Sequence, residues 1–129
     1  MPAPAVASED KMSAEVFWLY EVAVKPGQVE ALRTLMAELI ESTHAEPGAR
    51  GYQWSVSGDG SVAHIYERYA DSAATLAHVE RFRARFRQRF LAAVEPTRVV
   101  VYGTPTEDVK QALVPLRPVY MSALAGFAR

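Results

Sequence analysis

The chain has 129 residues, half of them hydrophobic, and a formal net charge of -1 at neutral pH. This length fits one domain with a sizeable core, and the near-zero charge excludes a general attraction to nucleic acid or to an acidic membrane surface. The absence of cysteine excludes disulfides, thiol nucleophiles and cysteine-ligated metals, and it fits a reducing compartment. No apolar run approaches the roughly 20 residues of a membrane helix. We therefore expect a cytoplasmic protein with no membrane partner.

The chain begins with a segment rich in proline and alanine, followed by a predicted strand. Residues 1–14, MPAPAVASEDKMSA, have neither the basic nor the apolar region of a signal peptide, so we expect a disordered tail. The next run, VFWLYEVAV from Val16 to Val24, is aromatic and β-branched with a weak period of two. Lys25-Pro26-Gly27 ends it, which predicts a strand.

A helix of about four to five turns is predicted next, because apolar residues recur at steps of three and four. Pro47-Gly48 ends this pattern. The apolar stripe consists of Val29, Leu32, Met36, Leu39, Ile40 and Thr43.

The stretch GYQWSVSGDGSVAHIYERY has two alternating runs around Gly58-Asp59-Gly60 and predicts a β-hairpin. A two-residue turn at Asp59-Gly60 would place Trp54 opposite Ile65, whereas a three-residue turn would place it opposite His64. We favour the first register because it collects apolar side chains on one face. Those side chains are Tyr52, Trp54, Ala63 and Ile65.

Two further helices and a strand follow. Asp71-Ser72 caps a helical region with a break near Arg83. The run RVVVYG after Pro96 predicts a strand buried on both faces, and Thr104-Pro105-Thr106-Glu107 has the pattern of a capping box that opens a short helix to about Val114. The buried stripe of the long helical region is Leu76, Val79, Phe82, Phe86, Phe90 and Val94.

The predicted order is β-α-β-β-α-β, which is the split β-α-β arrangement of ferredoxin-like α+β folds, with an antiparallel sheet and both helices on one face. Residues 15–104 would form this domain, and residues 105–129 a C-terminal helix and packing arm. The first strand is apolar on both sides, so the uncovered sheet face favours a partner subunit. We expect a homodimer that joins face to face through the sheets.

Three stretches carry a resemblance to a known family. AEPGARGYQW, HIYERY and ATLAHV, in this order and spacing, resemble the antibiotic biosynthesis monooxygenase family of dimeric α+β barrels. The matching features are a Pro-Gly-x-x-Gly-Tyr turn, a Glu-Arg-aromatic end to the third strand, and a histidine in the second helix. The resemblance covers about Val16 to Thr104.

The resemblance implies a small dimer with a pocket in each subunit between sheet and helices. Some members oxidise polyketide-like aromatic molecules with molecular oxygen and no cofactor, whereas others degrade haem or bind small molecules. Haem-degrading members use an Asn, a Trp and the helix-two His. Here the His matches His78 and the Trp position reads as Tyr69, but the chain contains no Asn. The haem-degrading activity is therefore not expected, and Gln53 would have to replace an Asn amide in an oxygenase.

Cofactor-free oxygenation needs a base and a dry aromatic pocket. His78 is the candidate base because histidine titrates near neutrality, and Tyr66 is a second candidate catalytic residue. Tyr66 and Tyr69 lie on opposite faces of their strand, so one should face the helices and the other the dimer interface. The candidate ligand-binding residues are Trp54, Tyr69, Tyr52, Trp18 and His64; packing in a core or interface is the alternative for each aromatic residue.

Two other patterns have simpler explanations. His44, His64 and His78 have no metal-ligand spacing, so we assign no metal. The basic run RFRARFRQRF resembles a nucleic-acid groove, but its phenylalanines repeat every four residues and would face the core, with arginines as solvated edges. We expect no nucleic-acid partner, although one arginine could reach an anionic substrate group at the pocket mouth.

The stretch HAEPGARGYQW, residues 44–54, is either a plain turn or the edge of a pocket. We interpret Pro47-Gly48 as a helix stop and Gly51 as a close backbone approach, with Tyr52 and Trp54 as the aromatic candidates. Two functional hypotheses stay open: a cofactor-independent monooxygenase acting on a small aromatic, quinol-like molecule, or a non-catalytic dimeric barrel that binds an apolar ligand. In either case the apolar tail VYMSALAGFAR would close the pocket or clasp the other subunit.

Overall fold

The computed structural model describes residues 14–127 and residue 129, so the predicted disordered tail lies almost wholly outside the described residues. The elements alternate in the predicted order β-α-β-β-α-β, with additions at the C-terminal end. They are β1 (Val16–Val24), α2 (Val29–His44), β2 (Ala49–Val56), β3 (Val62–Tyr69), α3 (Ser72–Arg85), α4 (Arg87–Ala93), β4 (Val94–Gly103), α5 (Glu107–Leu113), the 3-10 turn η1 (Val114–Leu116) and β5 (Val119–Met121).

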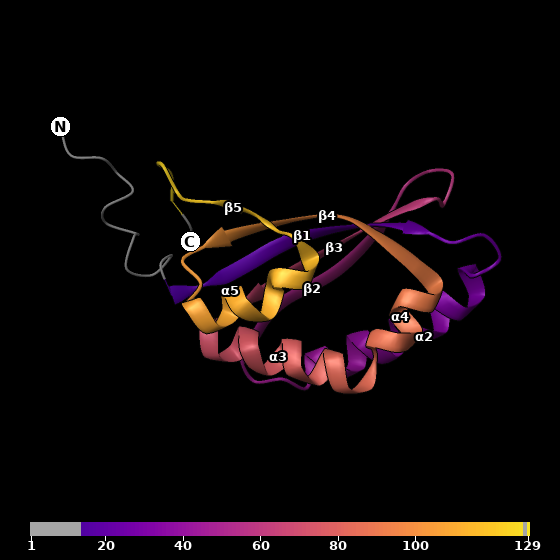
Figure 1. The fold of residues 1–129 in the computed structure, drawn as a ribbon, viewed down its shortest axis with the longest axis horizontal. Coiled ribbons are helices and arrows are strands. Elements are labelled where there is room, and N and C mark those ends of the chain that lie inside the picture. Colours follow the sequence, from indigo (N-terminus) through magenta and orange to yellow (C-terminus); the bar gives the residue numbers. More distant parts are fainter. Residues whose placement is uncertain (1–13, 128) are drawn as a thin grey trace.

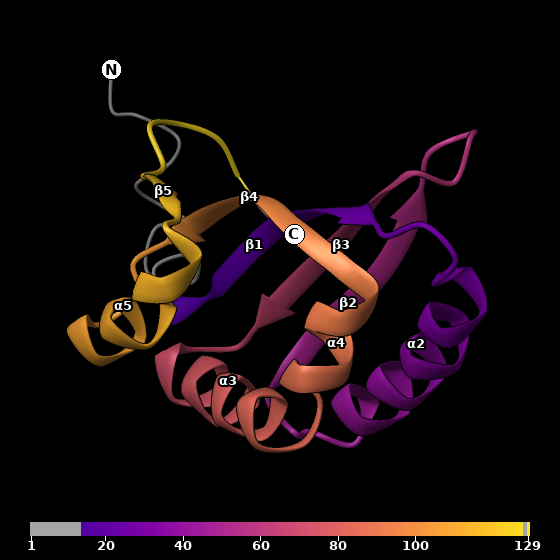
Figure 2. The ribbon, with the colours of Figure 1, turned by 45° about the vertical axis from the view of Figure 1, so that its right-hand side comes forward.

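The strands form one sheet in the order β2-β3-β1-β4-β5. The first four strands are antiparallel to their neighbours, and β5 runs parallel to β4. The helices lie together on one side of the sheet (Figure 1), and Figure 2 shows α5 beside β4 and β5, at the end opposite α2. This confirms the ferredoxin-like α+β fold. The sheet is open at both edges, so closure into a barrel with a second chain stays a prediction.

The first strand has two different faces, as the sequence predicted. Val16, Trp18, Tyr20 and Val22 are buried beneath the helices, while Phe17 and Leu19 project to the other side and stay half-buried. We call the helix-free side the outer face; its central residues are Phe17, Leu19, Tyr66 and Tyr102.

The hairpin has the favoured register, with Trp54 opposite Ile65. The turn itself is longer than two residues: the Ser57 N–H donates to the Val62 carbonyl over 2.8 Å, and the Gly60 N–H donates to the Ser57 carbonyl over 3.0 Å. The register is therefore confirmed, but the predicted two-residue turn is replaced by a loop over residues 58–61.

Three predicted boundaries are wrong. The break in the long helical region falls at Phe86, where α3 gives way to α4, and not near Arg83. Val94 belongs to β4, where it lies opposite Val24 of β1. Pro96 is part of the same strand, opposite Val22, next to a register shift between Glu21 and Val22. The capping box does not form: α5 begins after Thr106, whose hydroxyl donates to the Asp108 carboxylate instead of capping the helix.

The C-terminal segment divides into a packed part and an exposed part. Val109 and Leu113 of α5 are buried against the domain, whereas all three residues of β5 are exposed. Within the described residues, no helix is long and apolar enough to span a membrane.

Candidate functional site

The turn between α2 and β2 packs directly on α3. A Cβ on Gly48 would lie only 2.3 Å from the Cβ of Ala74, so no larger residue fits there without a shift. The Gly48 carbonyl also accepts a hydrogen bond from the Ala70 N–H over 2.9 Å. Gly51, to which the sequence analysis assigned the close approach, would place a Cβ at an ordinary 3.7 Å from Arg68. The close approach is therefore at Gly48, and it brings Glu46 next to α3.

His78 of α3 lies between two carboxylates. Its Nδ1 is 3.0 Å from Oε2 of Glu46, and its Nε2 is 3.2 Å from Oε1 of Glu67 on β3. The same Glu67 oxygen accepts a 2.6 Å hydrogen bond from the Tyr69 hydroxyl. The side chains of Glu46, Glu67 and His78 are each less than one tenth exposed. These residues form a buried, hydrogen-bonded chain, which we call the Glu-His-Glu network.

The network keeps His78 charged at neutral pH. Burial alone would lower the pKa of His78, but hydrogen bonds and charge interactions with Glu46 and Glu67 raise it to about 9. At neutral pH the imidazole therefore carries a proton on both ring nitrogens, and its role as a catalytic base stays a prediction.

The tyrosines around the network are neutral phenols. Burial, together with the charge of Glu67, raises the pKa of Tyr69 and of Tyr52 well above the ordinary value. The ring centroid of His78 lies 4.8 Å from that of Tyr69 and 6.1 Å from that of Tyr52. Tyr69 can thus position Glu67 by donating its hydroxyl proton in a hydrogen bond.

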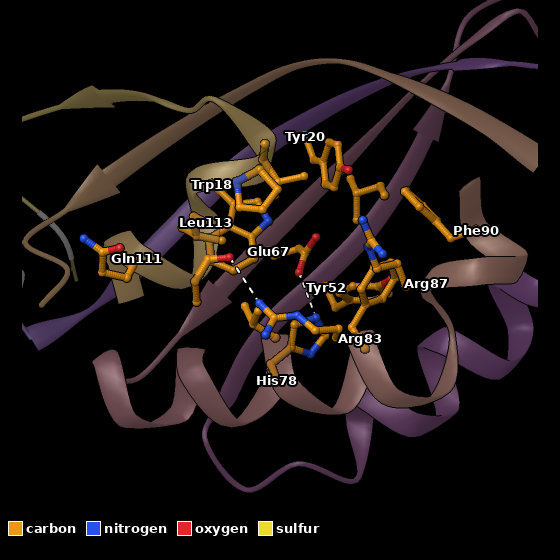
Figure 3. Close-up of a pocket in the computed structure, with 16 residues that line it drawn as sticks. Trp18, Tyr20, Tyr52, Glu67, His78, Arg83, Arg87, Phe90, Gln111 and Leu113 are labelled. Carbon is orange, nitrogen blue, oxygen red and sulfur yellow. Dashed lines mark hydrogen bonds and ion pairs between the residues drawn. The ribbon is translucent and has the colours of Figure 1, made fainter. Parts of the chain in front are cut away.

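A cavity of about 370 Å³ opens beside the network, between the sheet, α3, α4 and the C-terminal segment. Figure 3 shows Glu67 and His78 on one side of this space, below Trp18 and Tyr20, with Arg83 and Arg87 near them. Its lining is mainly apolar and aromatic, which suits a small organic ligand. The lining residues are Trp18, Tyr20, Tyr52, Ile65, Glu67, His78, Val79, Phe82, Arg83, Arg87, Phe90, Gln111, Ala112, Leu113, Pro115 and Leu116.

The C-terminal segment supplies one wall of this cavity. Gln111 to Leu116 belong to α5 and η1, outside the ferredoxin-like unit. Arg83 of α3 crosses to this wall, where its Nη2 donates to the Ala112 carbonyl over 3.3 Å. The segment after Thr104 therefore contributes to this cavity through α5 and η1. The described residues of the tail VYMSALAGFAR, which was expected to close the pocket or clasp a second subunit, do not line this cavity, and the first three form β5 at the sheet edge.

The structure brings some of the predicted site residues together and separates others. Trp18, Tyr52 and His78 line the cavity, and Tyr69 lies behind His78, fully buried. Trp54 is on the same face of the sheet but packs against Phe90, with ring centroids 6.3 Å apart.

Tyr66 and His64 are on the outer face, away from the cavity. The Tyr66 hydroxyl accepts hydrogen bonds from Arg68, and its ring lies 6.4 Å from that of Phe17. His64 Nε2 lies 3.0 Å from Oε1 of Glu21. The backbone alternation of β3 that points Tyr69 inward directs both residues to the opposite side.

Sequence reasoning missed the two carboxylates. Glu67 had a usable signal, because it occupies an inward position between Ile65 and Tyr69, where a charge is costly unless it is paired. Glu46 lies in the turn before Pro47 and had no such pattern. Within the described residues, no three potential ligands converge on a metal-sized site, and the two ring nitrogens of His78 hold different carboxylates.

A family model of antibiotic biosynthesis monooxygenases matches residues 16–95 of the chain. The chain belongs to the antibiotic biosynthesis monooxygenase family. The match contains Glu46, Glu67, Tyr69 and His78 and ends before the C-terminal wall of the cavity. No curated protein sequence is significantly similar to the chain.

Solved structures show how far the similarity extends. MupZ from Pseudomonas fluorescens is 25% identical with a TM-score of 0.76, and the match covers 92% of this chain and 91% of MupZ. Protein SO0527 from Shewanella oneidensis is 28% identical with a TM-score of 0.61, over 70% of this chain and 90% of that one. Rv0793 from Mycobacterium tuberculosis is 27% identical with a TM-score of 0.56, over 73% and 98%. A match over 92% of the chain necessarily extends past Thr104, so part of the C-terminal segment has a counterpart in MupZ.

Proposed function

We propose that this family member is a cofactor-independent monooxygenase that oxidises a small aromatic, quinol-like or polyketide-like molecule with molecular oxygen. The observation that carries the proposal is the carboxylate of Glu67, buried in the wall of an apolar cavity and fixed by Tyr69 and His78. Such a group can take a proton from a weakly acidic organic substrate while the cavity excludes water.

The network supplies both a base and a positive charge. Glu67 removes a proton from a phenol or an activated methylene group, and the resulting anion gives an electron to oxygen. His78, charged at neutral pH, then stabilises the oxygen anion that forms next to it. For a ring CH₂ that becomes C=O, one oxygen atom enters the product and the other leaves as water, so the substrate itself provides all the electrons.

The test is oxygen uptake by the purified protein with anthrones, naphthols and hydroquinones, without any added cofactor. Glu67→Gln keeps the shape of the side chain but removes the base, and we expect a loss of about 10²- to 10⁴-fold in rate. The matched control is Glu38→Gln, whose carboxylate pairs with Arg89 on the surface. Equal rates in the Glu67 variant and the wild type would contradict the assignment.

One observation favours the second hypothesis, a non-catalytic protein that binds an apolar ligand. Both ring nitrogens of His78 are already bonded to carboxylates, so neither is free to contact a substrate directly. This hypothesis predicts that aromatic ligands raise the melting temperature by mass action without any turnover. Oxygen uptake that disappears on heat denaturation would reject it.

We also propose that the chain works as a homodimer joined through the outer face, with residues 15–104 as the core unit and residues 105–129 as an accessory arm. The support is the aromatic surface there, which no helix covers. The ring centroids of Phe17 and Tyr102 are stacked 5.1 Å apart, and Tyr66 is more than one third exposed. The expected cytoplasmic location stays a prediction.

A further inference from the structure

A second cavity adjoins the first one at its far end. It has a volume of about 440 Å³ and shares Tyr20, Phe82, Arg87 and Phe90 with the first cavity, together with Pro115 and Leu116. The two spaces therefore adjoin each other along a boundary made by α3, α4, β1 and η1.

The charge of the second cavity differs from that of the first. Arg87, Arg98 and Arg117 line it, and its lining contains no aspartate or glutamate. Within the described part of the chain, the guanidinium groups of Arg87 and Arg117 form no ion pair or side-chain hydrogen bond. Arg98 lies opposite Glu21 in the β1–β4 register, and its positive charge adds to the side-chain hydrogen bonds that lower the pKa of Glu21. The nearby carboxylate of Glu21 is already hydrogen-bonded to His64 and Thr97.

Three arginines line this space, and two of them have no carboxylate partner among the described residues. Such a lining is suited to bind an anionic group, because a guanidinium matches the oxygens of a carboxylate or a phosphate. The remaining lining is mostly apolar, with Leu91, Val99 and Val119 among its residues. The two adjoining cavities thus place a carboxylate-imidazolium pair in the wall of one and arginines in the wall of the other.

We infer that the substrate of this pocket is an elongated amphipathic molecule, with its reactive part beside Glu67 and His78 and a carboxylate or phosphate group at Arg87, Arg98 and Arg117. This inference rests on the proposed function for the location of the reactive part. It goes beyond that function by assigning a second, anionic end to the substrate.

The first experiment compares the binding of decanoate, decyl phosphate, decanol and decylamine to the full chain by isothermal titration calorimetry. We expect the two anions to bind about tenfold more tightly than decanol, with a preference that weakens at high salt. The ratio of decanoate to decyl phosphate affinity distinguishes a carboxylate site from a phosphate site. Equal affinity for the anions and decanol, tighter binding of decylamine, or no binding of any chain would overturn the inference.

The second experiment locates the anionic end. Arg87→Gln and Arg98→Gln should each reduce the preference for anions about three- to tenfold and leave decanol affinity unchanged. Arg81→Gln is the matched control, because Arg81 lies in a different surface groove with Glu38 and Glu41. An unchanged anion preference in both site variants would overturn the inference.

These outcomes are independent of the oxygen-uptake test. Anion preference without oxygen uptake would support the inferred ligand and reject the oxygenase. Oxygen uptake with no effect of the arginine substitutions would support the oxygenase and reject the anionic end.

Discussion

At the scale of single residues, the unusual feature is a histidine that is buried and charged at the same time. Isolated burial would neutralise His78, but two carboxylates hold its pKa at about 9. The ordinary histidine pKa of 6.5 applies in the unfolded chain. Folding therefore raises the proton affinity of this side chain, and stability becomes dependent on pH.

We expect the free energy of unfolding to decrease by about 3 kcal/mol as the pH rises from about 6.5 to above 9. The contribution is complete below the unfolded pKa, because His78 is then protonated in both states, and it is lost as the pH rises through the folded pKa. Urea denaturation at a series of pH values measures it. His78→Gln should lack this slope; the same slope in the variant would show that another group is responsible.

The site could be predicted from the sequence only in part. His78 and Tyr69 follow from helical and strand periodicity combined with the family resemblance, and the alternation of β3 correctly separated Tyr66 from Tyr69. The carboxylate partners that raise the pKa of His78 could not be predicted from the sequence. Glu46 reaches His78 across 32 positions of sequence through the Gly48 turn, and no local pattern encodes such a contact.

At the scale of elements, the Gly48 turn holds α2, β2 and α3 in their relative positions. A methyl group at Gly48 would collide with the Cβ of Ala74, which is too short and too rigid to move aside. The turn and the first part of α3 would have to separate. Because Glu46 lies two residues before Gly48, the Glu-His-Glu network would widen too.

Gly48→Ala should therefore destabilise the protein by about 1–3 kcal/mol and lower the pKa of His78. Urea denaturation and a proton NMR titration of the histidines measure the two effects. Gly58→Ala is the matched control, because a Cβ there meets nothing within 4 Å. Adding Ala74→Gly to the Gly48 variant should restore part of the loss; no restoration would contradict the steric explanation.

The C-terminal wall gives another prediction at this scale. Leu113 of α5 is 1% exposed and lines the cavity, whereas Leu124 is 94% exposed. Leu113→Ala should cost about 2–5 kcal/mol and weaken ligand binding, while Leu124→Ala should stay within about 0.5 kcal/mol of the wild type. Thermal unfolding of both variants tests this. A small loss at Leu113 would mean that α5 is only loosely attached.

The order β-α-β-β-α-β was predictable because these elements have a clear period, but several boundaries and strand β5 were not. Phe82, Phe86 and Phe90 keep a spacing of four residues through the α3–α4 break, so the apolar pattern does not reveal it. Thr104 and Thr106 are both acceptable helix caps by type. Strand β5 is wholly exposed and carries no burial pattern at all.

At the scale of the whole molecule, the outer face is the main unexplained surface. Its central residues are apolar or aromatic, and the Arg68 guanidinium lies 4.5 Å from the centre of the Phe17 ring. Leu19 lies opposite both Tyr66 on β3 and Val100 on β4, in the middle of this face. A second copy of the chain would bury it.

Leu19→Glu should convert the expected dimer to a monomer that keeps its circular dichroism spectrum, because an unpaired charge at the centre of the interface is costly to bury. Sedimentation equilibrium measures the mass. Ile40→Glu, at an exposed position on α2, is the control and should leave the dimer intact. A wild-type protein that sediments as a monomer would reject the dimer proposal itself.

The central position of β1 has a consequence for the synthesis of the protein. This strand leaves the ribosome before the other four strands, yet one of its two neighbours is β4, which follows α2, the hairpin and both α3 and α4. At about 5–20 residues per second, the apolar side chains of β1 wait several seconds for that neighbour. The nascent chain is therefore open to chaperones and to aggregation until Gly103 has emerged, and the long sequence separation also slows spontaneous refolding.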